Sequence, residues 1–304
     1  MKEKKTHLTG YIFALLATAI WSMNFIIARG LSSSITPVSL AFFRWSIAAL
    51  FSVLLAGRSV WQSRAIIKRN LPYMILVSIL GVSLFNTLIY IAGRTTTAIN
   101  LSMISITFPI YIMILSRFIF HEKITKRKIL GMVIVFSGSV FLITKGDIEV
   151  LRSLSFSAGD LWMLLAAITF AVYSILLKFK PKDLEFLTFQ TATFIIGLII
   201  LVPFFIADRL GNPPITWSAE IFVSLGYVGI FASLIAFLIW NKAIHSIGAV
   251  KTSLIYYTLP LFSAADAMLI LGEEIHSYHL ISLVVIISGI LIASLSRRQT
   301  SISR

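Results

Sequence analysis

The sequence contains no cysteine, and charged residues of either sign are scarce. Only 12% of its 304 residues are charged, and 12 are acidic. Without cysteine, disulfides, thiolate nucleophiles and cysteine-ligated metals are excluded together. A phosphate-binding glycine loop is also missing, and His121-Glu122 is not followed by the second histidine of a metalloprotease helix. We therefore expect no cofactor, no resident metal and no direct use of ATP.

Long apolar runs fill most of the chain. Hydrophobic residues make up 58% of it, and the mean hydropathy is +0.94. Runs of 18 or more such residues are long enough to cross a hydrocarbon core of ~30 Å as helices, which satisfy their own backbone hydrogen bonds. Apolar runs between Gly, Pro and charged residues predict ten spans, at 9–29, 36–56, 71–92, 97–119, 127–144, 159–178, 186–207, 218–241, 248–271 and 278–296.

Basic residues gather on one side of these spans. The net charge is +14, which could suggest a nucleic-acid partner. Of the 26 Lys and Arg, 20 fall at the termini and in the loops of one side, five fall on the opposite side, and Arg44 lies inside the second span. Such asymmetry is a topology signal. It predicts a multi-pass protein of the cytoplasmic membrane with both tails, 1–8 and 297–304, in the cytoplasm and no nucleic-acid partner.

The two halves of the sequence are similar to each other. A shift of 151 residues aligns Phe118-Ile-Phe-His-Glu122 with Leu269-Ile-Leu-Gly-Glu273, and Pro109 with Pro260. Repeats at a fixed offset indicate a duplicated unit. Each unit, 9–144 and 159–296, has five spans, so the second must be inverted relative to the first. The expected fold is an all-α membrane protein of ten transmembrane helices in two inverted five-helix repeats. Such repeats place a binding site near the bilayer midplane.

The motifs in these repeats resemble a known family. Trp21-Ser-Met-Asn24-Phe, Arg44 within Phe-Phe-Arg-Trp, Pro109 followed by Phe-His-Glu122-Lys-Ile-Thr, and Pro260 followed by Leu-Gly-Glu273-Glu-Ile are similar to the EamA branch of the drug/metabolite transporter superfamily. The resemblance covers roughly residues 10–296. It implies ten helices, a central substrate cavity and, often, export of amino acids or related metabolites.

Polar and aromatic side chains inside the spans are candidates for lining that cavity, because polar groups are costly in lipid. Helical spacing groups these side chains into stripes along the spans. The alternative to lining a cavity is that they form hydrogen bonds between neighbouring helices, which is common in membrane bundles. The candidate substrate-binding residues are Trp21, Asn24, Arg44, Asn86, Tyr90, Thr107, Tyr173, Trp240, Asn241, Tyr256 and Asp266.

Two charged residues within spans each allow two interpretations. An unpaired Arg44 would cost at least ~2.5–3.5 kcal/mol, so it requires partners. It could bind a substrate carboxylate in a bidentate manner, or it could bond backbone carbonyls and lock helices together. Asp266, in the ninth span, would suit proton coupling if buried, or could line an outer vestibule.

Four repeated residues are candidates for structural or gating roles. Pro109 and Pro260 are predicted to kink the fourth and ninth spans. Glu122 and Glu273 precede the next helices, and Thr125 or Ser277 could cap those helices. Glu122 and Glu273 either fix the conformation of these turns or act as gates by pairing with basic neighbours. Glu273 and Glu274 with His276 and His279 could form a zinc cluster, but an ordinary loop is the stronger interpretation.

A transporter or facilitator of a small metabolite in the lipid bilayer accounts for these features best. An integral-membrane enzyme would require a clustered acid, base or metal set at one face. A scaffold or receptor would not require an inverted repeat. The repeat therefore favours transport over both alternatives.

Overall fold

The computed structural model describes residues 2–271 and 276–294, and all regular structure in these ranges is helical. Its helices are α1 (Lys2–Gly30), α2 (Pro37–Gln62), α3 (Arg64–Arg69), α4 (Leu71–Ser78), α5 (Phe85–Thr95), α6 (Ala98–Ser105), α7 (Phe108–Ile119), α8 (Lys126–Ile143), α9 (Ile148–Arg152), α10 (Ala158–Leu176), α11 (Phe186–Gly211), α12 (Ala219–Gly226), α13 (Ala236–Ile247), α14 (Ala249–Tyr256), α15 (Leu259–Leu271) and α16 (Ser277–Ser294). Two π-helical segments, η1 (Ile79–Leu84) and η3 (Tyr227–Ile235), and a 3₁₀ turn, η2 (Leu177–Phe179), join some of them.

Within the described residues, helices occupy all ten ranges that the apolar runs predict. Within the part of the chain that the structure describes, seven segments are long and apolar enough to cross a membrane. They are residues 8–30, 37–62, 71–95, 100–119, 158–179, 186–211 and 219–247. The other three predicted spans correspond to α8, the pair α14–α15, and α16. Ten crossings therefore remain a prediction.

The same departures from regular helix occur in both halves. The third predicted span contains η1 and the eighth contains η3. The fourth and ninth spans are broken at Ile106–Thr107 and Tyr257–Thr258, just before Pro109 and Pro260. Each proline lies in the first turn of a new helix, where its missing N–H is not needed. The predicted kinks are therefore interruptions between two helices.

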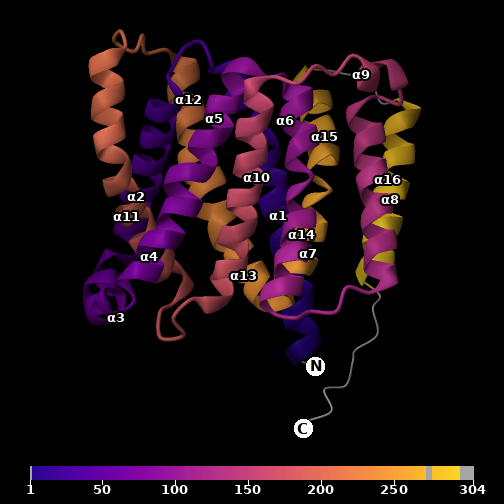
Figure 1. The fold of residues 1–304 in the computed structure, drawn as a ribbon. Coiled ribbons are helices and arrows are strands. Elements are labelled where there is room, and N and C mark those ends of the chain that lie inside the picture. The colour runs from indigo at the N-terminus through magenta and orange to yellow at the C-terminus, as the bar shows by residue number, and fades with distance from the viewer. Residues whose placement is uncertain (1, 272–275, 295–304) are drawn as a thin grey trace.

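Helix packing follows the same correspondence. α2 packs along α11, α7 against α14, and α8 along α16, which pairs each of these spans with its counterpart in the other half. The contact of α1 with α13 is matched by that of α10 with α5. α16 ends at the end of the bundle where α1 begins, and α9 lies at the opposite end (Figure 1). The arrangement is compatible with two antiparallel halves, while the cytoplasmic location of the termini stays a prediction.

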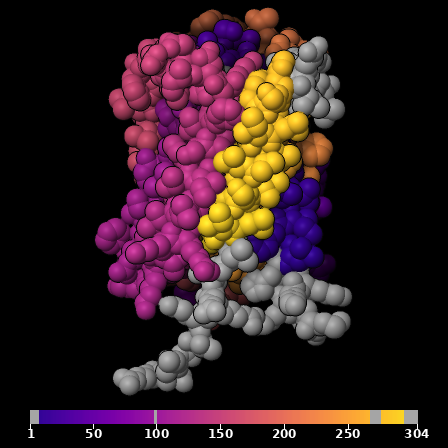
Figure 2. Space-filling view, turned by 90° about the vertical axis from the view of Figure 1, so that its right-hand side faces the viewer, coloured from indigo at the N-terminus to yellow at the C-terminus, as the bar shows by residue number. Residues whose placement is uncertain are grey.

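Helices α8 and α16 approach each other closely through glycine. Figure 2 shows the yellow surface of α16 lying directly along the magenta surface of the first half. A Cβ added at Gly131 of α8 would lie 2.6 Å from both the backbone nitrogen of Ala293 and the carbonyl oxygen of Gly289. Small residues permit such backbone contact between membrane helices.

Replacing Gly131 with alanine is expected to force α8 and α16 apart. Overpacking of this kind typically costs about 1–3 kcal/mol. Thermal unfolding of the detergent-purified variant should show a lower midpoint than the wild type. Gly211→Ala is the control, because a Cβ at Gly211 meets nothing within 4 Å. Equal stability of the Gly131→Ala variant and the wild type would contradict the contact.

Candidate functional site

Arg44 lies at the centre of a hydrogen-bond network between four spans. Its side chain is 0% exposed. Its Nε donates to Ser233 Oγ at 2.5 Å, and Nη1 donates to Asn24 Oδ1 at 2.7 Å and to Tyr90 Oη at 2.8 Å. Nη2 donates to the carbonyl oxygen of Ala232 at 3.2 Å. The guanidinium of α2 thus ties together α1, α5 and η3.

All of these partners are neutral. The two ion pairs among the described residues, Arg152–Glu149 and Arg209–Asp208, do not involve Arg44. Four of the five N–H groups of the guanidinium already have protein acceptors, so a substrate carboxylate could not bind in a bidentate manner without displacing some of them. The geometry favours the helix-locking interpretation of Arg44.

The π-helical segment η3 supplies part of this network. The carbonyl oxygen of Ala232 accepts from Arg44 and also from Trp21 Nε1, at 2.8 Å. Ser233 Oγ donates to the carbonyl oxygen of Val228, five residues earlier, at 2.7 Å. π-Helical turns often occur at functional sites because they change which backbone groups are accessible. Trp21 therefore connects the Arg44 network to the aromatic residues beyond it.

A cluster of aromatic rings, called the aromatic core below, fills the centre of the bundle next to this network. Its members come from both halves and are Trp21, Phe108, Phe170, Tyr173, Phe237, Trp240 and Tyr256. Trp21 contacts Trp240 at a centroid distance of 5.0 Å and Phe170 at 5.5 Å, and Phe108 meets Tyr256 edge to face at 4.4 Å. The Trp21–Phe170 and Phe108–Tyr256 contacts have the edge-to-face geometry that is favourable for aromatic pairs.

Three buried side-chain donors, two of them on α13 at the aromatic core, have no acceptor within the described structure. Trp240 Nε1 and Asn241 Nδ2, on adjacent residues of α13, are buried and unpartnered, and so is Asn86 Nδ2 of α5. Asn241 uses only its carbonyl oxygen, which accepts from Tyr173 Oη at 3.2 Å. A buried polar group without a partner costs about 1–3 kcal/mol. These donors are therefore available for an acceptor group on a ligand.

Of the eleven predicted cavity residues, eight come together and two lie elsewhere, while Asn86 is buried on α5 with its Nδ2 unpartnered. Asn24, Arg44 and Tyr90 form the network, and Trp21, Tyr173, Trp240, Asn241 and Tyr256 belong to or border the aromatic core. Thr107 instead lines a pocket that it shares with Asn100 and Asp160. Asp266 bonds Ser22 of α1.

The acids proposed for structural or gating roles are only partly described. Glu122 lies in the α7–α8 loop, and its backbone N–H donates to the carbonyl oxygen of Ser116 at 3.3 Å. Thr125 caps α8 by accepting from the backbone N–H of Lys128. Glu273 and Glu274 lie outside the described residues, so the structure does not describe the zinc cluster that the sequence allows.

Sequence reasoning missed Asp160, which is 2% exposed in the first turn of α10. Its Oδ2 accepts from the backbone N–H of Ser157 at 2.7 Å, and its two oxygens accept from Asn100 Nδ2 at 3.0 and 3.1 Å. Ser157 three residues before Asp160 is the spacing of a capping box, and this signal could have indicated its role. Asp160 is therefore a second acid within a predicted span, 159–178, besides Asp266.

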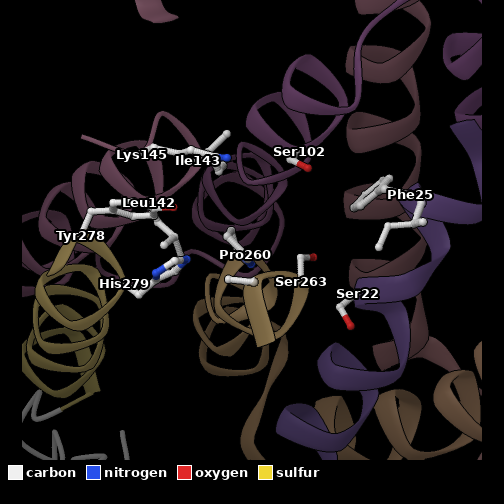
Figure 3. Close-up of a pocket in the computed structure, with 12 residues that line it drawn as sticks. Ser22, Phe25, Ser102, Leu142, Ile143, Lys145, Pro260, Ser263, Tyr278 and His279 are labelled. Carbon is white, nitrogen blue, oxygen red and sulfur yellow. The ribbon is translucent and has the colours of Figure 1, made fainter. Parts of the chain in front are cut away.

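A separate pocket of about 240 Å³ opens between α1, α6, α8, α15 and α16. Figure 3 shows Ser22, Ser102 and Ser263 on its side towards α1, with Tyr278, His279 and Lys145 opposite. It lies towards the end of the bundle at which α8 ends and α16 begins. Serine hydroxyls give it a polar wall beside Asp266, which is half-buried on α15.

Comparisons with known proteins agree with this architecture. The model of the EamA-like transporter family matches twice, at residues 8–144 and 157–295. The chain is 30% identical to the uncharacterized transporter YyaM of Bacillus subtilis, over 95% of this chain and 94% of that protein. It is 27% identical to an uncharacterized transporter of Archaeoglobus fulgidus, over 98% and 100% of the two chains.

The fold also occurs among solved structures. One crystal structure superposes with a TM-score of 0.75 at 15% identity and covers 94% of this chain and 96% of that chain. At this identity the likeness concerns the fold alone. The family model, in contrast, matches nearly the whole sequence in two copies. The chain is a multi-pass membrane protein and belongs to the EamA-like transporter family.

Proposed function

We propose that this protein is a secondary transporter or facilitator that moves a small metabolite across the cytoplasmic membrane by alternating access. Its ten crossings form two inverted halves, 9–144 and 159–296, with both tails in the cytoplasm. The substrate is an amino acid or a related compound, and the direction is export. Rocking of the halves against each other would expose the core to each side in turn.

One observation carries this proposal. Unpartnered hydrogen-bond donors, Trp240 Nε1 and Asn241 Nδ2, border a ring of aromatic side chains contributed by both halves. Aromatic walls suit an apolar or aromatic part of a metabolite, and the donors suit its carboxylate or carbonyl oxygens. Apolar contact and hydrogen bonding to a metabolite could thus both occur where the two halves meet.

The repeated interruptions support the alternating-access part of the proposal. Broken helices in corresponding positions of two halves are typical of transporter binding sites. Here η1 and η3, and the breaks before Pro109 and Pro260, occur at matching places. A helix made of two short segments can change its angle at the break at little cost, because few backbone hydrogen bonds are disturbed.

Counterflow in proteoliposomes tests the function. Vesicles loaded with single amino acids and related metabolites would be assayed for uptake of the same radiolabelled compound, with and without a pH gradient. We expect exchange of at least one compound. Absence of exchange for the whole panel by protein that remains folded would count against transport of this substrate class.

The donors can be tested with that substrate. Trp240→Phe keeps the ring and removes only the N–H, and Asn241→Leu keeps the approximate volume and removes both polar groups. Each variant is expected to lower transport efficiency at least tenfold, since a hydrogen bond to a charged group is worth about 1.5–3 kcal/mol. Asn212→Ala is the control, because Asn212 is exposed and directly follows α11. Unchanged efficiency in both core variants would exclude the proposed site.

A further inference from the structure

A basic pocket lies at the edge of the bundle, beside the short helix α3. This pocket, called the α3 pocket below, has a volume of about 430 Å³. Ile66 and Arg69 line it from α3, and Lys182 and Asp183 line it from the loop between η2 and α11. α3 lies at the end of the bundle where α1 begins (Figure 1). Because α3 belongs to the first half of the chain and the loop to the second, the pocket lies between the two halves.

Arg69 and Lys182 are the basic residues of the α3 pocket, one on each wall. Both are exposed, and among the residues that the structure describes neither forms an ion pair or a side-chain hydrogen bond. A guanidinium can donate two parallel hydrogen bonds to a phosphate group, and an ammonium adds a compact positive charge. The pocket therefore offers two uncommitted cations to a single anion.

An acid, Asp183, also lines the α3 pocket, but it has a cation of its own. Asp183 interacts electrostatically with Lys180, three residues earlier in the same loop. The loop holds this lysine in place, because Lys180 Nζ donates to the carbonyl oxygen of Pro181 at 2.9 Å and to that of Leu184. Lys180 thus compensates Asp183 within the loop, and the two cations that line the pocket stay uncompensated.

Two other cations at this end of the bundle are matched by aromatic rings. The guanidinium carbon of Arg64 lies 4.9 Å from the ring centroid of Trp61, and Lys178 Nζ lies 3.6 Å from that of Phe120. Such cation–π contacts are favourable. Within the described part of the chain, the two cations of the α3 pocket have no such ring. Their partner must therefore come from outside the chain.

The α3 pocket lies at the expected level of the membrane surface. Trp61, near the end of α2, is 70% exposed, and Leu71, the first residue of α4, is 41% exposed. Exposed tryptophan beside basic residues is typical of the boundary between hydrocarbon and lipid headgroups. α3 joins these two spans, with Ile66 packed against the core and Arg69 exposed. Headgroup phosphates are therefore the anions that this level of the membrane supplies.

We propose that the α3 pocket binds the phosphate group of an anionic phospholipid from the leaflet at this end of the bundle. Arg69 bonds two phosphate oxygens, and Lys182 approaches the same group from the second half. Basic pockets on the cytoplasmic side of membrane proteins bind such headgroups, which agrees with the predicted orientation. The site is separate from the aromatic core and does not depend on the proposed function. Because the phosphate contacts both halves, bound lipid stabilises the folded protein.

Thermal unfolding of the full chain in detergent tests the site with soluble probes. We expect dioctanoyl-phosphatidylglycerol to raise the unfolding midpoint of the wild type in a concentration-dependent manner. Zwitterionic dioctanoyl-phosphatidylcholine should raise it less, and inorganic phosphate should leave it unchanged. An equal rise with inorganic phosphate would overturn the proposal, because it would assign the pocket to a soluble anion.

The double variant Arg69→Gln, Lys182→Gln removes both cations. It is expected to bind phosphatidylglycerol at least about tenfold more weakly and to lose the preference over phosphatidylcholine. The matched control is Lys126→Gln, Arg127→Gln, which removes the same charge at two exposed residues of α8 that do not line the pocket. This control should bind as the wild type does. Equal weakening in both double variants would show a general effect of charge and would overturn the site.

Single variants at Lys182 keep the test decisive if the double variant does not fold, because Lys182 is exposed in a loop. Native mass spectrometry then measures how much phosphatidylglycerol stays bound to the folded chain. We expect less bound lipid for Lys182→Gln and wild-type binding for Lys182→Arg, which keeps the charge. Wild-type binding by Lys182→Gln would contradict the proposal.

Discussion

Replacing Arg44 with lysine is expected to destabilise the protein strongly and to reduce transport of every substrate in the same proportion. The guanidinium spreads its donors over three nitrogens that reach Ser233, Asn24, Tyr90 and Ala232. A single ammonium group keeps the charge but cannot reach all four acceptors. Each hydrogen bond lost from a charged donor costs about 1.5–3 kcal/mol, so the loss of two exceeds the effect of most single substitutions.

Arg58→Lys provides the control for this experiment, because Arg58 lies on the same helix and is exposed. Thermal unfolding in detergent and counterflow should both be close to wild type for that variant. A stable Arg44→Lys protein that loses transport of anionic substrates alone would instead show that Arg44 binds a substrate carboxylate.

Gly81→Ala is expected to disturb the aromatic core and to abolish most transport. A Cβ at Gly81, in η1, would lie 2.5 Å from Tyr173 Cδ2, and such a contact requires the ring to move. Tyr173 stacks on Phe170 at 5.7 Å and bonds Asn241, so its displacement changes both the wall and the donor next to it. We expect at least a tenfold decrease in transport efficiency, together with the cost of about 1–3 kcal/mol typical of overpacking.

The matched control is Gly226→Ala, next to the π-helical segment of the other half. A Cβ at Gly226 meets nothing within 4 Å, so this variant should transport as the wild type does. Restored activity in the double variant Gly81→Ala, Tyr173→Phe would not be expected, because the ring still clashes. Wild-type transport by Gly81→Ala alone would mean that the position of Tyr173 is unimportant.

The helix positions could be predicted from sequence because lipid requires long apolar segments. The network around Arg44 was also partly predictable. A buried arginine needs partners, and Asn24 and Tyr90, two polar candidates on neighbouring spans, are among them. Ser233 was not singled out because a lone serine in an apolar run is usual in membrane helices.

The remaining features depend on three-dimensional packing. Phe108 and Phe170 look like any lipid-facing phenylalanine in the sequence, and only the fold shows that they complete the aromatic core. η1 and η3 carry no distinctive residue pattern, although η3 sets the register of Ser233. Asp160 was overlooked because an acid at the end of a span is usually exposed, whereas the α5–α6 corner covers this one.

The central claim is that the second half of the chain is inserted upside down relative to the first, with the core between the halves. The absence of cysteine allows a direct measurement, since one introduced cysteine is the only thiol. Gln62→Cys follows the second span and Asn212→Cys follows the seventh, its counterpart, and both residues are exposed. A membrane-impermeant maleimide applied to intact cells should label Asn212→Cys and not Gln62→Cys, with the reverse pattern in inverted vesicles. Labelling of both cysteines from the same side would contradict the inverted arrangement and the mechanism based on it.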